Sequence, residues 1–422
     1  MLTIQQRLTN SFYAMLSLPA TAMGFALSVQ ISALSWILTT QFNLDIHDVG
    51  LVWAAGPLAG IFGQVIIGLI SDKVWFWGGR RRPFIVIGGI LAALMLLALP
   101  NLDLIHEATG VAILLVAVSV ALTLDLAINI SFNPTRSIIA DVTPEGNPRT
   151  KGYTWMQTIS GFFGVAAYLI GAILGNFTLI YVSVFLVLLF SVIPTFFVEE
   201  PRELSVPAEG ESEVAVHVTE WGELFKLYGA HAFTWLGVQT MFVYIIAFIQ
   251  QKMPSLTNDE TGQVISISFA VLNTVGFILP AFVLEPVAQK IGRVKTHMSA
   301  VAVMALGYAL IVFMGHTPLS LYILMAVVGI GWAAVVSLPF AIMSEKVDKN
   351  RMGFFMGIFN LSVVIPQLLV SLFVGKFILD AADKNFIFIF CAASLAISAF
   401  LWLFVKESRF ISKATPGAGG GH

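Results

Sequence analysis

One acidic and one basic residue stand in the same long apolar stretch of the chain. Asp125 is the only acid in the interior of any of these stretches, and Arg136 follows it eleven residues later. Eleven residues make about three helical turns, so both side chains share one helix face, roughly 16 Å apart. A charge at membrane depth costs several kcal/mol unless it faces a polar cavity or a partner, which makes the pair a candidate functional site. The alternative is a structural pair that holds helices together.

The amino-acid composition indicates that the helix with Asp125 and Arg136 spans a membrane. Of 422 residues, 58% are hydrophobic and 11% are charged, too few charges to cover the surface of a soluble protein. Apolar stretches of about 20 residues recur throughout, as bilayer-spanning helices need. Strict alternation of apolar and polar residues is absent, which argues against barrel strands. We therefore expect an all-α membrane protein with twelve transmembrane helices: 12–40, 49–71, 84–101, 110–138, 153–177, 179–198, 228–251, 263–288, 297–314, 319–343, 353–378 and 386–405.

The basic residues predict the orientation of these helices. With a cytoplasmic N-terminus, every Lys and Arg falls in a cytoplasmic segment with four exceptions. Arg136 lies within a span, and Lys252, Lys376 and Lys384 lie at span ends or in loops on the other side. Cytoplasmic loops carry this excess of Lys and Arg in membrane proteins generally. Both termini are therefore predicted to be cytoplasmic, in a plasma or bacterial inner membrane. The first apolar run is too long for a cleavable signal peptide, so none is expected.

The chain divides into two similar halves. An acid precedes Gly-Arg by seven residues just after the second span, at Asp72, and again at the end of the eighth, at Glu285. Matching acid and Arg pairs follow the fourth and tenth spans. A duplicated six-helix unit of this kind is the parallel repeat of the major facilitator fold, in which substrate binds between the halves. We predict bundles at 1–198 and 228–410, a flexible acidic linker at 199–227 and a disordered tail at 411–422.

Charged residues at the cytoplasmic ends of the spans are predicted to form a gate. The segment Gly68-Leu-Ile-Ser-Asp72-Lys73, followed by Gly79-Arg80-Arg81-Arg82, resembles the signature loop of major facilitator transporters. Such a cluster could latch the halves together and break during transport, whereas simple positive-inside anchoring would explain the arginines alone. The predicted gating residues are Asp72, Arg80, Arg81, Asp141, Glu285, Arg293, Glu345 and Arg351.

The fourth span and its exit narrow the resemblance. Asp125, Asn129, Pro134 and Arg136 are followed by Ala140-Asp141, Thr143-Pro144-Glu145 and Arg149-Thr-Lys-Gly152. Together with Val74-Trp-Phe-Trp-Gly, this pattern resembles the sucrose–proton symporters, a glycoside–pentoside–hexuronide-like family of plant, animal and bacterial carriers. The resemblance is clearest over 50–165 and suggests a bacterial-type member.

That resemblance implies proton-coupled import of a disaccharide such as sucrose or maltose by alternating access. It implies Asp125 as the proton site, since a poorly solvated carboxylate can bind a proton near neutral pH, and Arg136 as a donor to sugar hydroxyls. Amides and flat aromatic faces would complete a sugar site, although each of these side chains could equally join helices. The predicted substrate-binding residues are Arg136, Asn129, Gln30, Gln64, Trp235, Gln239, Asn273 and Asn360, with Trp155, Gln157, Trp332 and Gln367 as further candidates.

Other functions remain open at this point. A proton-driven exporter of small amphipathic compounds or a sugar sensor that does not transport would use the same fold. An intramembrane enzyme is not expected, because no nucleophile–base set, metal motif or phosphate loop is present. We expect no cofactor, metal or nucleic acid; the expected partners are a small neutral sugar, protons and the bilayer, with a monomeric chain. His231 and His297 are candidate proton relays, and Trp36 and Trp402 candidate anchors at the bilayer interface.

Overall fold

The computed structural model of the chain describes residues 3–60, 70, 74–144, 147–202, 219–344, 346–347 and 352–407. Most of these residues are helical, and their only β-type pairing is an isolated bridge between Phe76 and Gly79. Eleven described helices are long and apolar enough to cross a membrane. The remaining predicted span, the second at 49–71, begins within a described helix, but residues 61–69 and 71 lie outside the described part. The predicted all-α membrane fold is confirmed.

The first half of the chain forms one group of helices. Its long central helix α2 starts where the Thr9 hydroxyl accepts from the Phe12 N–H at 3.3 Å, an N-cap that satisfies a free helix-end donor. The helix of the third predicted span, 84–101, is longer than expected. It continues past Asn101 and ends at Gly110, whose φ is +70°. The elements are α1 (Thr3–Gln6), α2 (Asn10–Thr40), α3 (Ile46–Trp53), α5 (Arg82–Ala98), η1 (Leu99–Asn101), α6 (Leu102–Thr109), α7 (Ile113–Val142), α8 (Asn147–Leu174) and α9 (Asn176–Phe196).

The second half forms the other group, and two of its long helices contain a π-helical turn. One turn, η2, begins at Pro280, and the other, η4, begins four residues after Pro366. Proline removes a helix hydrogen bond, and π turns inside helices are common at functional sites. The elements are α10 (Trp221–Lys252), α11 (Asn258–Leu279), η2 (Pro280–Leu284), α12 (Glu285–Ile291), α13 (Arg293–Met314), α14 (Pro318–Val335), α15 (Leu338–Ser344), α16 (Met352–Leu369), η4 (Val370–Val374), α17 (Gly375–Asp380) and α18 (Asn385–Trp402).

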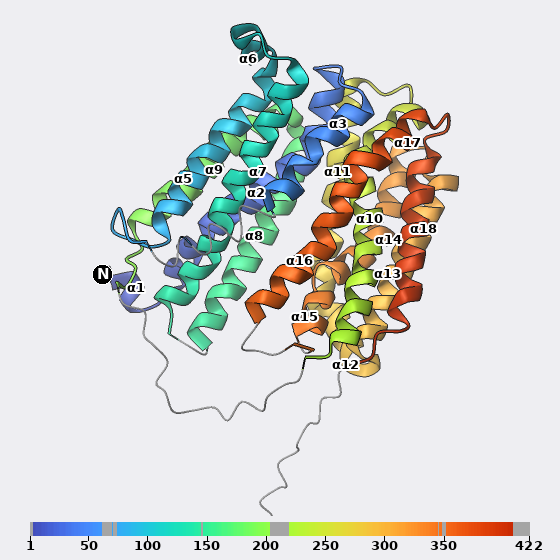
Figure 1. Cartoon of the computed structure of the whole chain (residues 1–422). Helices are drawn as coiled ribbons and strands as arrows, with labels where there is room; N and C mark the ends of the chain where they lie inside the picture. Colours follow the sequence, from blue (N-terminus) through green and yellow to red (C-terminus); the bar gives the residue numbers. More distant parts are fainter. Residues whose placement is uncertain are drawn as a thin grey trace, which may run out of the picture.

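The two groups stand side by side (Figure 1). The N-terminal helices, blue to green, occupy one side of the view, and α10 to α18, green to red, occupy the other. The ends of α7, α9 and α18 and the start of α10 lie at the lower face in that view, which we call the linker face. The α3 and α17 ends lie at the upper face, which we call the opposite face.

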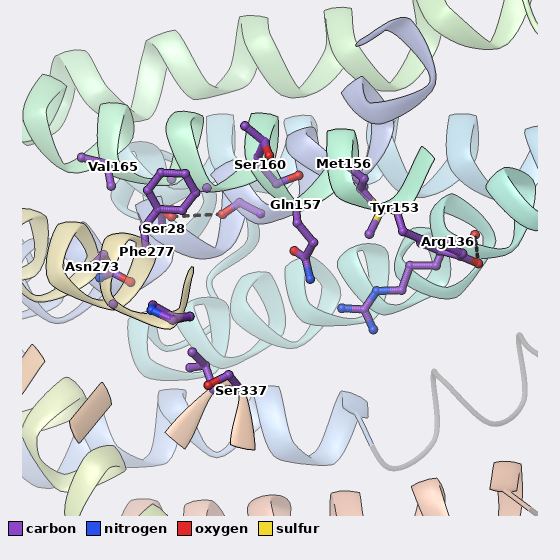
Figure 2. Close-up of a pocket in the computed structure, with 18 of the residues that line it drawn as sticks. Ser28, Arg136, Tyr153, Met156, Gln157, Ser160, Val165, Asn273, Phe277 and Ser337 are labelled. Atoms are coloured by element: carbon purple, nitrogen blue, oxygen red, sulfur yellow. Dashed lines mark hydrogen bonds between the residues drawn. The ribbon is translucent and has the colours of Figure 1, made fainter. Parts of the chain in front are cut away.

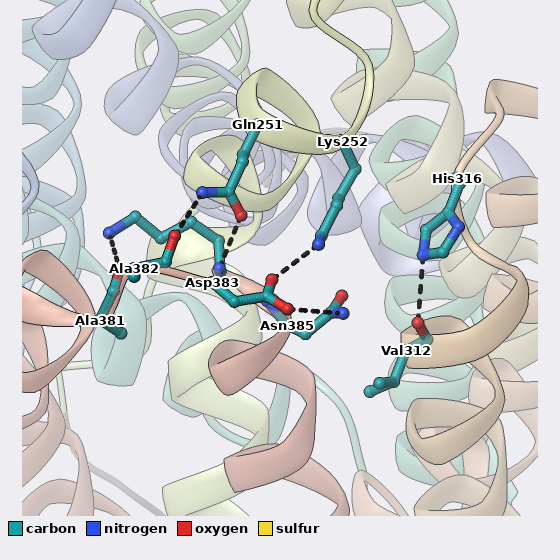
Figure 3. A network of polar contacts seen from close by, with 9 residues as sticks. Gln251, Lys252, Val312, His316, Ala381, Ala382, Asp383 and Asn385 are labelled. Carbon is teal, nitrogen blue, oxygen red and sulfur yellow. Dashed lines mark hydrogen bonds and ion pairs between the residues drawn. The ribbon is translucent and has the colours of Figure 1, made fainter.

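On the opposite face, polar contacts bind the α17–α18 turn to the end of α10 (Figure 3). Lys252 Nζ lies 2.6 Å from Asp383 Oδ1, and the Gln251 amide donates to Ala382 O and accepts from Lys384 N. The Lys384 ammonium also donates to three carbonyls at the end of α17, where a cation is favourable. These contacts join the end of α10, the end of α17 and the turn that follows it.

The two tryptophans predicted to anchor the protein at the bilayer interface are instead inside it. Trp36 and Trp402 are both fully buried. The Trp36 indole N–H donates to Asn258 O at 2.6 Å, which joins α2 to the start of α11. The Trp402 ring packs edge-on against His297, with centroids 4.4 Å apart. The prediction was wrong because an amphipathic ring near a helix end can join helices as well as anchor in lipid, and sequence alone does not distinguish the two.

Candidate functional site

A cavity of about 300 Å³ lies between the two groups of helices, roughly midway along them. Its volume is at the lower end of the range for small-molecule sites. Six predicted site residues meet there: Gln30, Asp125, Asn129, Trp235, Gln239 and Asn360, with the further candidates Trp332 and Gln367. The structure thus brings together side chains that are hundreds of residues apart in the chain.

The N-terminal wall of this central cavity carries its only acid among the described residues. Asp125 is 6% exposed, and its Oδ2 accepts from the Gln30 amide at 3.0 Å. Asn129, one turn on, donates to the Asp125 backbone carbonyl at 2.8 Å. Gly56 allows the close approach, because a Cβ there would lie 3.2 Å from Asp125 Oδ2. In the described part of the chain no Lys, Arg or His forms a salt bridge with this carboxylate.

The C-terminal wall combines aromatic rings with amides. Trp332 packs edge-to-face against Trp235, at 6.2 Å between centroids, and against Phe242, at 5.4 Å. The Gln367 amide donates to Gln239 Oε1 at 3.1 Å. Phe242 and Trp53 also line the cavity and were not predicted, because a ring in an apolar helix does not reveal from sequence whether it faces a cavity or lipid. The cavity therefore has a polar, acidic wall and an aromatic, amide-bearing wall.

Arg136 lies in a second cavity, not beside Asp125. This vestibule of about 840 Å³ is lined by α2, α7, α8, α11 and α14 and includes Gln157 and Asn273. The guanidinium carbon of Arg136 lies 4.2 Å from the centroid of the Phe132 ring, which is a cation–π arrangement. In Figure 2 the Arg136 and Gln157 side chains both extend into the open space below α8. Phe132 and Trp332 line both cavities and so form the boundary between them.

Contacts between the halves close the central cavity toward the opposite face. Ser32 Oγ lies 2.7 Å from Ser266 Oγ, which also donates to Asn176 Oδ1 at 3.0 Å. Ser35 donates to Val243 O at 2.9 Å and accepts from the Trp53 indole at 2.8 Å. Since the vestibule is lined by the linker-face ends of α7, α8 and α14, the site is open toward the linker face and closed toward the opposite face.

Two of the predicted gating arginines, Arg80 and Arg81, have contacts with the first half or the segment directly after it. Arg81 Nε donates to Asp141 Oδ2 at 3.0 Å, and the Arg81 side chain is buried. The Arg80 guanidinium donates to Arg202 O at 3.1 Å. Predicted residues Gln64, Asp72, Glu345 and Arg351 lie outside the described residues, as does the Glu285 side chain. The proposed latch between halves stays a prediction, and the described contacts belong to a structure open on that face.

Two glutamates that sequence analysis missed occupy equivalent positions in the two halves. The Glu200 carboxylate accepts from the backbone N–H groups of residues 80, 81 and 82, each at 2.8 Å. Glu407 likewise accepts from the N–H groups of Arg293, at 2.7 Å, and Val294, at 3.0 Å. Each carboxylate thus sits at a helix N-terminus, where a negative charge is favoured. The signal was present as Val-Glu-Glu200 and Val-Lys-Glu407 at the end of each half.

Two helix groups that enclose a polar cavity open to one face define a membrane transporter. The chain belongs to the Major Facilitator Superfamily, whose sequence pattern matches residues 16–371. It is 22% identical over 418 residues to the sucrose transport protein SUC4 of Arabidopsis thaliana, with 83% of this chain and 81% of that protein covered. It is 30% identical over 244 residues to the general alpha-glucoside permease of Schizosaccharomyces pombe, with 50% and 42% covered.

Solved transporter structures confirm the fold. The nucleoside transporter NupG superposes with a TM-score of 0.70 at 14% identity and covers 94% of this chain and 98% of its own. The POT family transporter PepTSo superposes with a TM-score of 0.67 at 11% identity, covering 94% of this chain and 98% of its own. At these identities the likeness concerns the fold alone.

Proposed function

We propose that the protein is a proton-coupled symporter that imports a disaccharide, such as sucrose or an α-glucoside, by alternating access. The observation that carries this proposal is Asp125, a buried acid in the central cavity that accepts one amide hydrogen bond and has no described cation beside it. Burying an unpaired carboxylate is unfavourable, so proton binding stabilises the site. Named relatives that carry sucrose and α-glucosides support the substrate class.

The cavity chemistry suits a neutral sugar. Gln30, Asn129, Gln239 and Asn360 offer amide donors and acceptors, and the tryptophans offer flat apolar faces. Arg136 lines the vestibule, and in this proposal sugar passes it on the way between the central cavity and the linker face. There its planar fork can donate to sugar hydroxyls as substrate leaves.

The direction of transport follows from the orientation that we propose. The basic residues put the linker face in the cytoplasm of a cell whose plasma or inner membrane holds the protein. The structure then corresponds to the state that releases sugar inward. One proton moved by 100 mV supplies about 2.3 kcal/mol, roughly a fifty-fold accumulation of a neutral solute. We also propose that the chain acts as a monomer, and that its halves, 1–198 and 228–410, are joined by the linker 199–227 and move relative to each other during transport.

The test uses purified protein in liposomes with radiolabelled sucrose and maltose. Wild type should accumulate sugar when a pH gradient, acidic outside, is imposed. Asp125→Asn should lose that accumulation but keep exchange of labelled for unlabelled sugar, because exchange needs no net proton movement. Gradient-driven accumulation by Asp125→Asn with unchanged pH dependence would refute the proton-site role. Sugar binding without flux in wild type would instead indicate a sensor, and expulsion of amphipathic compounds an exporter.

A further inference from the structure

The indole N–H of Trp235 does not point into the central cavity, although the ring lines it. Trp235 Nε1 donates to His231 Nε2 at 3.0 Å, one helical turn earlier on α10. An indole N–H can only donate, so His231 Nε2 must be the unprotonated nitrogen of a neutral ring. The hydrogen bond therefore fixes both the rotation of the indole and the tautomer of the imidazole.

His231 is itself enclosed by its neighbours. Its ring is 2% exposed and stacks on Phe359 of α16, with centroids 4.8 Å apart and planes inclined by 17°. It is not among the residues that line either cavity. A buried histidine bonded to the next turn could instead serve only the packing of the helix. An experiment has to distinguish this packing role from a role in sugar binding.

The second tryptophan of the aromatic wall is held in the same manner. Trp332 Nε1 donates to Asn273 Oδ1 at 3.2 Å, and the Asn273 amide donates onward to Phe269 O at 2.9 Å. Both indole N–H groups are thus engaged by side chains of their own half. The tryptophans then offer ring carbons to the cavity, while hydrogen bonding falls to the amides and Asp125.

We propose that His231 is a positioning residue of the sugar site: it holds the Trp235 indole so that its ring packs against the apolar face of a pyranose. This inference rests on the proposed function and narrows its substrate class to glycosides that present a pyranose ring. Asn273 does the same for Trp332, so its amide acts on the ring and not directly on sugar. Positioning of this kind gives specificity because supporting hydrogen bonds lock the side chains that contact the ligand.

A double-mutant cycle tests the proposal with sucrose and maltose exchange in liposomes. Loss of one neutral hydrogen bond predicts that His231→Leu raises the sugar KM about three- to tenfold, with little change in the maximal exchange rate. His231→Gln, which keeps an acceptor near the position of Nε2, should restore most of the affinity. In a Trp235→Phe background, which lacks the indole donor, His231→Leu should change KM less than twofold, because the two residues act as a unit.

His297→Leu is the matched control. His297 is another fully buried histidine of the same half, but it packs against Trp402 and lines neither cavity. It should leave the sugar KM unchanged in protein that remains folded by detergent thermal unfolding. An equal KM increase from His231→Leu in both backgrounds, or from His297→Leu, would overturn the proposal.

A second readout does not depend on sugar. The indole N–H resonance of Trp235, assigned by its loss in Trp235→Phe, should shift in His231→Leu and return toward its wild-type position in His231→Gln. If the resonance shifts in His231→Leu but the wild type transports no sugar, the proposed function is refuted. The hydrogen bond between Trp235 and His231 would then be a structural contact. An unchanged resonance would refute the positioning role itself.

Discussion

Gly50 is the position at which one added methyl group should move the transporter out of its present state. Gly50 lies on α3 of the first half and faces Tyr244 of α10 and Ser371 of η4 in the second half. A Cβ at Gly50 would lie 2.6 Å from the Ser371 carbonyl oxygen and still closer to the Tyr244 hydroxyl. Tyr244 is fully buried and donates to Val370 O at 3.2 Å, so it has no room to withdraw.

The expected magnitude follows from this geometry. Overpacking by one methyl group against fixed neighbours costs about 1–3 kcal/mol. Since the clashing atoms belong to opposite halves, separating the halves on the opposite face relieves the strain. Each 1.4 kcal/mol is a factor of ten, so Gly50→Ala should shift the equilibrium about five- to 140-fold toward the state open on the opposite face.

The assay measures distances between spin labels at residues 47 and 376, placed on α3 and α17, in a Cys391→Ser background. Gly50→Ala should move population from short to long distances. Gly88→Ala is the matched control: its Cβ would lie 2.6 Å from Ala127 O, but both residues belong to the first half. That variant should lose stability without shifting the distances. Identical distributions for Gly50→Ala and wild type, or the same shift in Gly88→Ala, would refute the reasoning.

Three further predictions follow from individual contacts. Arg136→Lys keeps the charge but loses the planar guanidinium with its paired donors. The sugar KM should rise about tenfold, because one charged hydrogen bond to the sugar is lost. An unchanged KM would mean that the arginine is structural. Glu200→Gln should lower the free energy of unfolding by about 1.5 kcal/mol. This is the lower end of the range for hydrogen bonds to charged groups, because Glu200 is partly exposed. Thermal unfolding should show this loss, and Glu107→Gln, at an exposed position, should unfold like wild type. The Lys252 ammonium holds the pKa of the exposed Asp383 carboxyl below its usual range, so the contribution of this contact to stability is present above about pH 4 and falls away at lower pH, as the carboxylate is protonated. Unfolding temperatures of wild type and Asp383→Asn should therefore converge in acid, and a constant difference down to pH 3 would contradict the assignment.

The class of the protein and its main charged residue were predictable from sequence. Apolar spans and few charges require a membrane, and the isolated Asp125 in one span is too unfavourable to be incidental. The amides Gln30, Asn129 and Gln239 were likewise predictable as candidates, because buried amides need partners. Local composition and helical periodicity are enough to predict the membrane spans and these polar candidates, so the prediction does not require knowledge of the fold.

The tertiary structure decided which of these residues meet. Asp125 and Arg136 share a helix face, yet they line different cavities because Phe132 and Trp332 lie between those cavities. Sequence spacing fixes positions along a helix but not what the neighbouring helices place against it. The same holds for Glu200: its charge is visible in the sequence, but the three N–H groups that it accepts from lie about 120 residues away. Contacts between distant helices depend on packing of the whole chain, and that is why only the folded structure shows a cavity with one acidic and one aromatic wall, open on a single face.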